Sequence, residues 1–140
     1  MLFEVSITIP AGTAHDNPAT VILPIGHGVI TKIMVRPRPG HAGVAHCVIR
    51  HHEHQIAPSQ ESMDFHGDAF PIDWEEDYEV SQPPYELKIE GWNDSTLYPH
   101  TFDVFVAVLD RQRTLITATT DAIRQALAML SPRRIFTGGS

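Results

Sequence analysis

Short runs of alternating apolar and polar residues fill the first 110 positions of the chain. In the clearest run, Tyr85, Leu87 and Ile89 alternate with charged residues. A period of two places apolar side chains on one face of a β-strand. The same reasoning predicts strands or strand pieces over residues 3–9, 20–23, 28–36, 43–51, 55–58, 69–74, 78–80, 85–92 and 101–109.

Proline and glycine separate these runs. Residues 10–12, 37–40 and 82–84 carry prolines, which remove ladder donors and so end strands. Polar residues 59–68 are typical of a long surface loop, and the acidic run over 73–77 is interpreted as a solvated loop. Residues 101–109 are apolar on both faces, which predicts a central strand covered on both sides.

Two faces are assigned within the strand predicted over residues 28–36. Val29, Thr31, Ile33 and Val35 form one face, which is the one suited to a core, and Ile30 falls on the other. No helical pattern interrupts the strands before residue 110. The sequence therefore predicts an all-β fold, an antiparallel jelly-roll-like β-sandwich over residues 1–110.

The pattern changes near the C-terminus. Ile123, Ala126, Leu127 and Leu130 recur at helical spacing, preceded by threonines that can cap a helix and followed by Pro132. We expect residues 111–140 to form one C-terminal amphipathic helix and a tail. The apolar stripe either packs on its own domain or docks on a neighbour. The predicted interaction residues are Ile123, Leu127, Leu130, Arg133, Arg134, Ile135 and Phe136.

Composition narrows the classes of function. The 140 residues are 42% hydrophobic with a net charge of -7, which disfavours both disorder and binding of nucleic acid by the whole surface. No stretch reaches the roughly 20 apolar residues of a membrane helix, and the first residues lack the basic region of a signal peptide. We expect synthesis in the cytoplasm without export. Cys47, the single cysteine, is expected to be a buried thiol.

Nine histidines make metal binding the sharpest enzymatic hypothesis. On one strand His52 and His54 would share a face and could bind one ion through imidazole nitrogens. The alternative is that these histidines lie at an exposed strand end or a subunit contact. The candidate third ligands are His46, His66 and His100.

The histidine pair resembles part of the first cupin motif, in which a strand presents His-x-His followed by a glutamate and a glycine. The corresponding residues here are His52, His54, Glu61 and Gly67. Glu61 is further from His54 than in the motif, and no second segment of glycine, proline and histidine follows. A cupin-like metal protein or enzyme is one alternative function.

Aromatic residues support a second alternative, a carbohydrate-binding sandwich. Their rings could stack on sugars, although aromatics at alternating positions also form cross-strand pairs in a core. The residues concerned are Trp74, Tyr78, Tyr85, Trp92 and Tyr98.

Several runs together resemble small phage and prophage virion-surface β-sandwich proteins, which include capsid decoration proteins. The resemblance covers about residues 3–109 and is one of strand order and turn placement. The runs that carry it are residues 23–30, 52–58, 83–87, 92–94 and 98–101.

This resemblance implies a structural protein that assembles on a larger capsid or shell protein at the virion surface. It implies a homo-oligomer, with a trimer favoured, and it carries over no catalytic residue. We therefore expect neither an enzyme nor a cofactor, and no nucleic-acid or membrane partner. Bound stoichiometric metal lost on mutating His52 and His54, or glycan binding lost in Trp92→Ala, would favour the alternatives.

Overall fold

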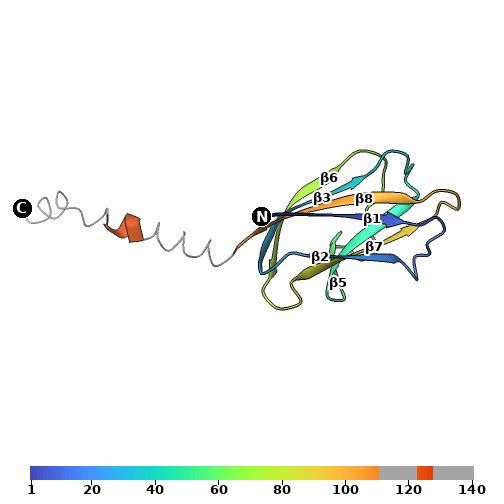
Figure 1. Ribbon diagram of the computed structural model, residues 1–140. Helices are drawn as coiled ribbons and strands as arrows, with labels where there is room; N and C mark the ends of the chain where they lie inside the picture. The colour runs from blue at the N-terminus through green and yellow to red at the C-terminus, as the bar shows by residue number, and fades with distance from the viewer. Residues whose placement is uncertain (111–122, 128–140) are drawn as a thin grey trace, which may run out of the picture. The chain divides into compact units, whose positions relative to one another are not determined.

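The computed structural model describes residues 1–110 and 123–127 (Figure 1). The chain divides into two units, Met1–Leu109 and Asp110–Ser140. The first unit holds eight strands. They are β1 (Leu2–Ile9), β2 (Ala19–Pro24), β3 (Gly28–Pro37), β4 (Ala45–His51), β5 (His54–Ala57), β6 (Ile72–Val80), β7 (Glu86–Asn93) and β8 (His100–Leu109).

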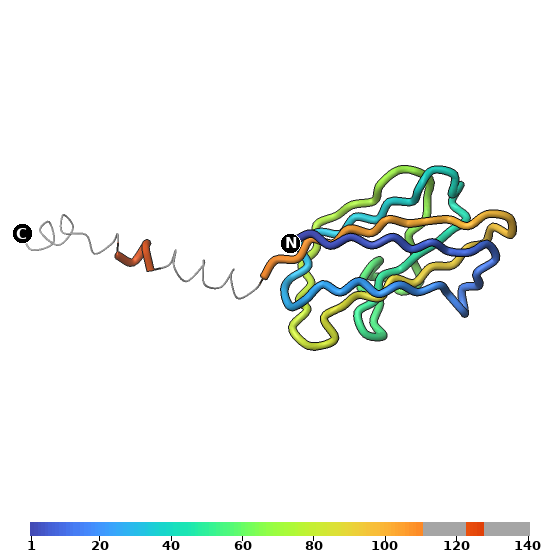
Figure 2. Tube along the Cα trace, in the orientation of Figure 1, coloured from blue at the N-terminus to red at the C-terminus, as the bar shows by residue number. Residues whose placement is uncertain are grey.

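The eight strands form two four-stranded antiparallel sheets. Their orders are β1-β8-β3-β6 and β2-β7-β4-β5. The first strand pairs with the last, the second with the seventh, the third with the sixth and the fourth with the fifth. This pairing is that of a long hairpin rolled into two facing layers, which Figure 2 traces. It confirms the predicted jelly-roll sandwich.

The core lies between the two sheets. Alternate residues of β8, from Phe102 to Val108, point inward against Ile33 of β3 and Ile89 of β7, and all are almost fully buried. Cys47 on β4 also lies in this core, and burial raises the pKa of its thiol far above the ordinary range. The prediction of a buried structural cysteine is confirmed.

A β-bulge in β3 corrects the predicted division of its faces. The register with β8 shifts between Ile30 and Lys32, so Thr31 is the extra residue in β3. Ile30 and Ile33 are consequently both buried in the core, although they are three positions apart. The assignment of Val29 and Thr31 to the core face and of Ile30 to the outer face was wrong, because the extra residue changes which alternate positions face the core on the two sides of the bulge.

Two other expectations about strands need correction. The acidic run over residues 73–77 is the middle of the edge strand β6, which keeps its alternating exposure throughout. Glu76 is accommodated there because its carboxylate accepts a hydrogen bond from Trp74 Nε1 at 3.0 Å. Strand β8 is fully covered on its inner face, whereas Phe105 and Ala107 on its outer face are half-buried and Leu109 is exposed.

Gly91 on β7 allows the two sheets to approach closely. A Cβ at this position would overlap the side chain of Ile9 and lie 3.2 Å from the carbonyl oxygen of His46. We expect Gly91→Ala to lower the free energy of unfolding by about 1–3 kcal/mol, as overpacked cores do. Urea denaturation of both proteins measures the difference. The other glycines among the described residues have positive φ, so none of them offers a matched control, and a variant as stable as the wild type would contradict the close approach of the sheets at Gly91.

In the second unit, residues 123–127 are helical, and all five are exposed. Ile123 and Leu127, one turn apart, belong to the predicted apolar stripe. The rest of the predicted helix and the tail, with Leu130, Arg133, Arg134, Ile135 and Phe136, lie outside the described residues. No helix in the described part of the chain is long and apolar enough to cross a membrane.

Candidate functional site

Four loops meet at one end of the sandwich, since the pairing of the strands brings β1–β2, β3–β4, β5–β6 and β7–β8 to the same end. Backbone hydrogen bonds join them in pairs. Gly12 of the first loop donates to the carbonyl of Ser95 in the last at 2.7 Å, and Gly43 donates to Gly67 at 3.2 Å. Asp94 of the β7–β8 loop also donates to the carbonyl of Val44 in the β3–β4 loop at 2.9 Å, so the two pairs form one connected surface.

The β5–β6 loop turns back along the edge of β4 that β5 leaves unpaired. Cys47 and Phe65 exchange two backbone hydrogen bonds, of 3.0 and 2.9 Å, in an isolated antiparallel bridge. Because side chains alternate along extended chain, the buried Phe65 leaves Asp64 and His66 facing outward. His46, which precedes Cys47, faces outward as well.

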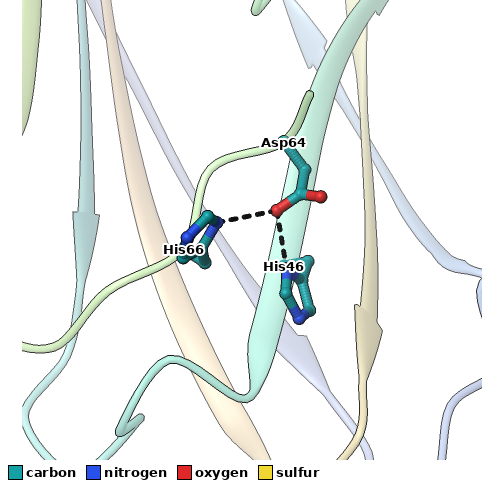
Figure 3. A group of neighbouring side chains, drawn as sticks. All are labelled: His46, Asp64 and His66. Atoms are coloured by element: carbon teal, nitrogen blue, oxygen red, sulfur yellow. Dashed lines mark hydrogen bonds and ion pairs between the residues drawn. The ribbon is translucent and has the colours of Figure 1, made fainter. Parts of the chain in front are cut away.

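The three side chains form a histidine–aspartate cluster, defined by His46, Asp64 and His66 (Figure 3). The Asp64 Oδ1 atom lies 2.6 Å from Nδ1 of His46 and 3.0 Å from Nδ1 of His66. On its other side, Nε2 of His46 lies 3.2 Å from Oδ2 of Asp94 in the β7–β8 loop. Two carboxylates therefore flank the His46 ring.

Trp92 lies beside His46, because the two residues are directly opposite each other on β7 and β4. The His46 ring lies nearly parallel to it, with 5.4 Å between ring centroids, and the ring of His15 stacks on it at 4.1 Å. Gln55 fixes the start of the loop, since its side-chain amide lies in donor range of the carbonyl oxygens of Pro58, Gln60 and Met63. Trp92 therefore packs against His46, and Gln55 holds the loop that carries Asp64.

A pocket of about 320 Å³ lies beside the cluster, on the outer face of the second sheet. The β1–β2 and β5–β6 loops form its walls. An ion pair between Arg50 and Glu90, with 3.0 Å between Nε and Oε2, forms part of its floor. Its lining includes His15, Asp16, Glu61, Asp64 and Trp92, so its polar surface is largely acidic.

The fold of the first unit also occurs among solved structures. The structure is similar to a chain of the cyanophage Pam1 capsid asymmetric unit, with a TM-score of 0.50. The match covers 76% of this chain and 81% of that chain at 12% identity. The two chains share a fold. No protein-family model matches the sequence, and no curated protein matches it.

The proposed pairing of His52 and His54 on one strand was wrong. β4 ends at His51 and β5 begins at His54, so His52 lies in the two-residue turn between them, with a φ of 57°. The turn breaks the alternation that would have aligned the two rings. His100 lies on β8 in the other sheet, where its ring packs 4.7 Å from that of His41.

The side chain of the neighbouring His51 is buried, and both of its ring nitrogens have hydrogen-bond partners within the fold. Its Nε2 donates to the carbonyl oxygen of Pro84 at 3.4 Å, which leaves Nδ1 to accept from the Tyr78 hydroxyl at 2.8 Å. Burial, with the charges of His52 and His54, lowers the pKa of His51. The sequence motif at residues 51–54 is therefore a hairpin turn preceded by one buried histidine.

The aromatic candidates do not share one role. Trp74 and Tyr78 pack against the core, and Trp92 is covered by His15 and His46. Tyr98, in the β7–β8 loop, is 66% exposed.

Sequence reasoning named His46 and His66 only as possible third ligands and missed Asp64 and Asp94. The two-residue spacing of Asp64 and His66 is a weak indication in the sequence that their side chains lie together, because alternate residues of an extended segment share a face. Exposed apolar residues were also missed. Phe70, in the β5–β6 loop, and Leu97, in the β7–β8 loop, are 82% and 76% exposed at the same end of the sandwich.

Proposed function

We propose that the protein is a structural component of a virion, a capsid decoration or stabilising protein without catalytic activity. It assembles as a symmetric homo-oligomer, with a trimer favoured, on a larger shell protein. The observation that supports this most is the eight-stranded jelly roll, matched over most of its length by a cyanophage capsid chain. Because a fold hosts many functions, the surface has to support the role as well.

Apolar side chains on the surface favour contacts with other proteins. Phe70, Leu97 and Tyr98 project from loops at one end of the sandwich, where a shell subunit could cover them. Ile123 and Leu127 are 55% and 65% exposed on one side of the described helical turn. Burial of such groups between protomers drives assembly.

Purified particles test the attachment to a shell. Virions isolated on a density gradient from the source of this chain are expected to contain its peptides in many copies per particle. Quantitative mass spectrometry of the gradient fractions measures the copy number relative to the major shell protein. Recovery of the chain only from fractions without particles would contradict the proposal.

Substitution of Leu127 tests the oligomer. The full-length protein is expected to elute as a closed oligomer in size-exclusion chromatography with light scattering. Leu127→Asp places a carboxylate in the apolar stripe and should shift the mass towards the monomer. Gln125→Asp, which adds the same charge within the same turn, is the matched control and should leave the mass unchanged. A monomeric wild-type protein, or equal masses for both variants, would contradict assembly through this stripe.

A further inference from the structure

The histidine–aspartate cluster has the donor set and spacing of a metal site. Its two imidazole nitrogens and one carboxylate oxygen all lie within 4.8 Å of one another. Around a tetrahedral zinc ion with bonds of about 2.0–2.1 Å, neighbouring ligand atoms lie about 3.3 Å apart. The distances from Asp64 Oδ1 to His46 and His66, 2.6 and 3.0 Å, need only widen slightly.

Asp94 stands where a metal-bound histidine needs a second partner. A histidine that binds a metal through one nitrogen usually donates its other N–H to a carboxylate, which fixes the tautomer. Nε2 of His46 lies 3.2 Å from Oδ2 of Asp94, while Nδ1 faces Asp64. With the proton on Nε2, the lone pair of Nδ1 is directed towards the other two ligands.

The backbone holds the three ligands together without a metal. The two backbone hydrogen bonds between Cys47 and Phe65 pair the segment that carries Asp64 and His66 with β4, the strand that carries His46. The site remains accessible, since the His66 side chain is 54% exposed. Asp64 and Asp94 add the negative charge that attracts a cation.

We propose that a zinc ion binds His46 Nδ1, the Asp64 carboxylate and His66 Nδ1, and ties the β5–β6 loop to β4. Two imidazoles with one carboxylate suit zinc, whereas magnesium and calcium prefer oxygen ligands alone. Water completes the coordination on the exposed side. The site is independent of the proposed virion role, because it rests on side-chain geometry and not on the shared fold.

Isothermal titration with zinc chloride tests the site on the full-length protein, stripped with chelator and free of any polyhistidine tag. We expect one equivalent to bind. His66→Asn removes one ligand at an exposed position, and affinity should fall at least tenfold, since loss of even an outer partner of a ligand costs about 10–100-fold. His54→Asn removes an exposed histidine outside the cluster and is the matched control, with unchanged affinity expected.

Thermal unfolding supplies a second readout. Zinc should raise the melting temperature of the wild type and of His54→Asn, but not that of Asp64→Asn or His66→Asn. Wild-type protein that binds no zinc saturably would overturn the proposal. Equal affinities for the wild type and His66→Asn, or equal losses in His66→Asn and His54→Asn, would also overturn it, because binding would then be spread over surface histidines.

Discussion

Replacing Arg36 and Arg38 together by alanine is expected to lower the free energy of unfolding by more than the loss of a surface ion pair does, because the buried carboxylate of Asp103 loses both of its cationic partners. The carboxylate of Asp103 on β8 is only 2% exposed. Arg36 Nη2 donates to it at 2.8 Å, Arg38 donates at 3.2 and 2.9 Å, and the Ser6 hydroxyl donates at 2.6 Å. Without the two guanidinium groups, the Ser6 hydroxyl would be the remaining one of these side-chain donors.

This network also sets a dependence on pH. The hydrogen bond from Arg38, helped by those from Ser6 and Arg36, holds the pKa of Asp103 well below its ordinary range despite burial. A lowered pKa means that the unfolded chain binds more protons on acidification. The stabilisation is complete above the unfolded pKa of about 3.9 and is lost as pH falls through the folded pKa. The wild type and the double variant should therefore differ less at pH 3 than at pH 6.

Urea unfolding at these two pH values measures both effects. Lys32→Ala is the control, because the Lys32–Asp73 pair joins side chains that are 55% and 53% exposed at 3.4 Å. Such a surface pair contributes at most about 1 kcal/mol. A double variant no less stable at pH 6 than this control would show that the Asp103 carboxylate is solvated in another way.

Phe102→Ala is expected to lower the free energy of unfolding by about 3–5 kcal/mol, the usual cost of removing a buried phenylalanine ring. Phe102 is 0% exposed and is among the largest fully buried side chains. Its ring meets the His41 ring edge-on at 4.7 Å, at the end of the sandwich where the four loops meet. The cavity would therefore loosen the base of those loops as well as the core.

Phe105→Ala on the same strand is the matched control. Its ring lies on the outer face, half-buried, with the Arg36 guanidinium 5.9 Å from its centroid. A loss of about 1 kcal/mol is expected there, because less surface returns to water. Chemical denaturation of both variants gives the comparison. Equal losses would contradict the division of β8 into a core face and an outer face.

The sequence by itself determined where most of the strands lie, although the two runs predicted over residues 69–74 and 78–80 belong to one strand, β6. Period-two alternation and proline positions are local, so they indicated β1, β7 and β8 within one or two residues of their ends. They also indicated the jelly roll, since many short strands without intervening helices have few ways to cover their apolar faces. The buried Cys47 followed from the same pattern.

Only the tertiary structure decided where that alternation breaks. The bulge at Thr31 depends on the strands that flank β3, and β6 extends through its acidic residues because β3 pairs with it. The turn at His52 likewise depends on the pairing of β4 with β5. The pairings of β3 join segments distant in the sequence, and the turn at His52 depends on how two neighbouring strands pair, so the alternation of residues along one strand does not encode either feature.

The candidate site shows most clearly which features the sequence determined and which the tertiary structure decided. The abundance of histidine indicated that metal chemistry had to be considered, but adjacent histidines in the sequence suggested the wrong group. His46 and His66 meet because a long loop folds back and pairs at Cys47, and Asp94 arrives from a loop 48 positions beyond His46. The sequence determined which ligand types were available, and long-range backbone pairing decided which of them lie together, because side chains converge only where the fold brings their strands and loops side by side.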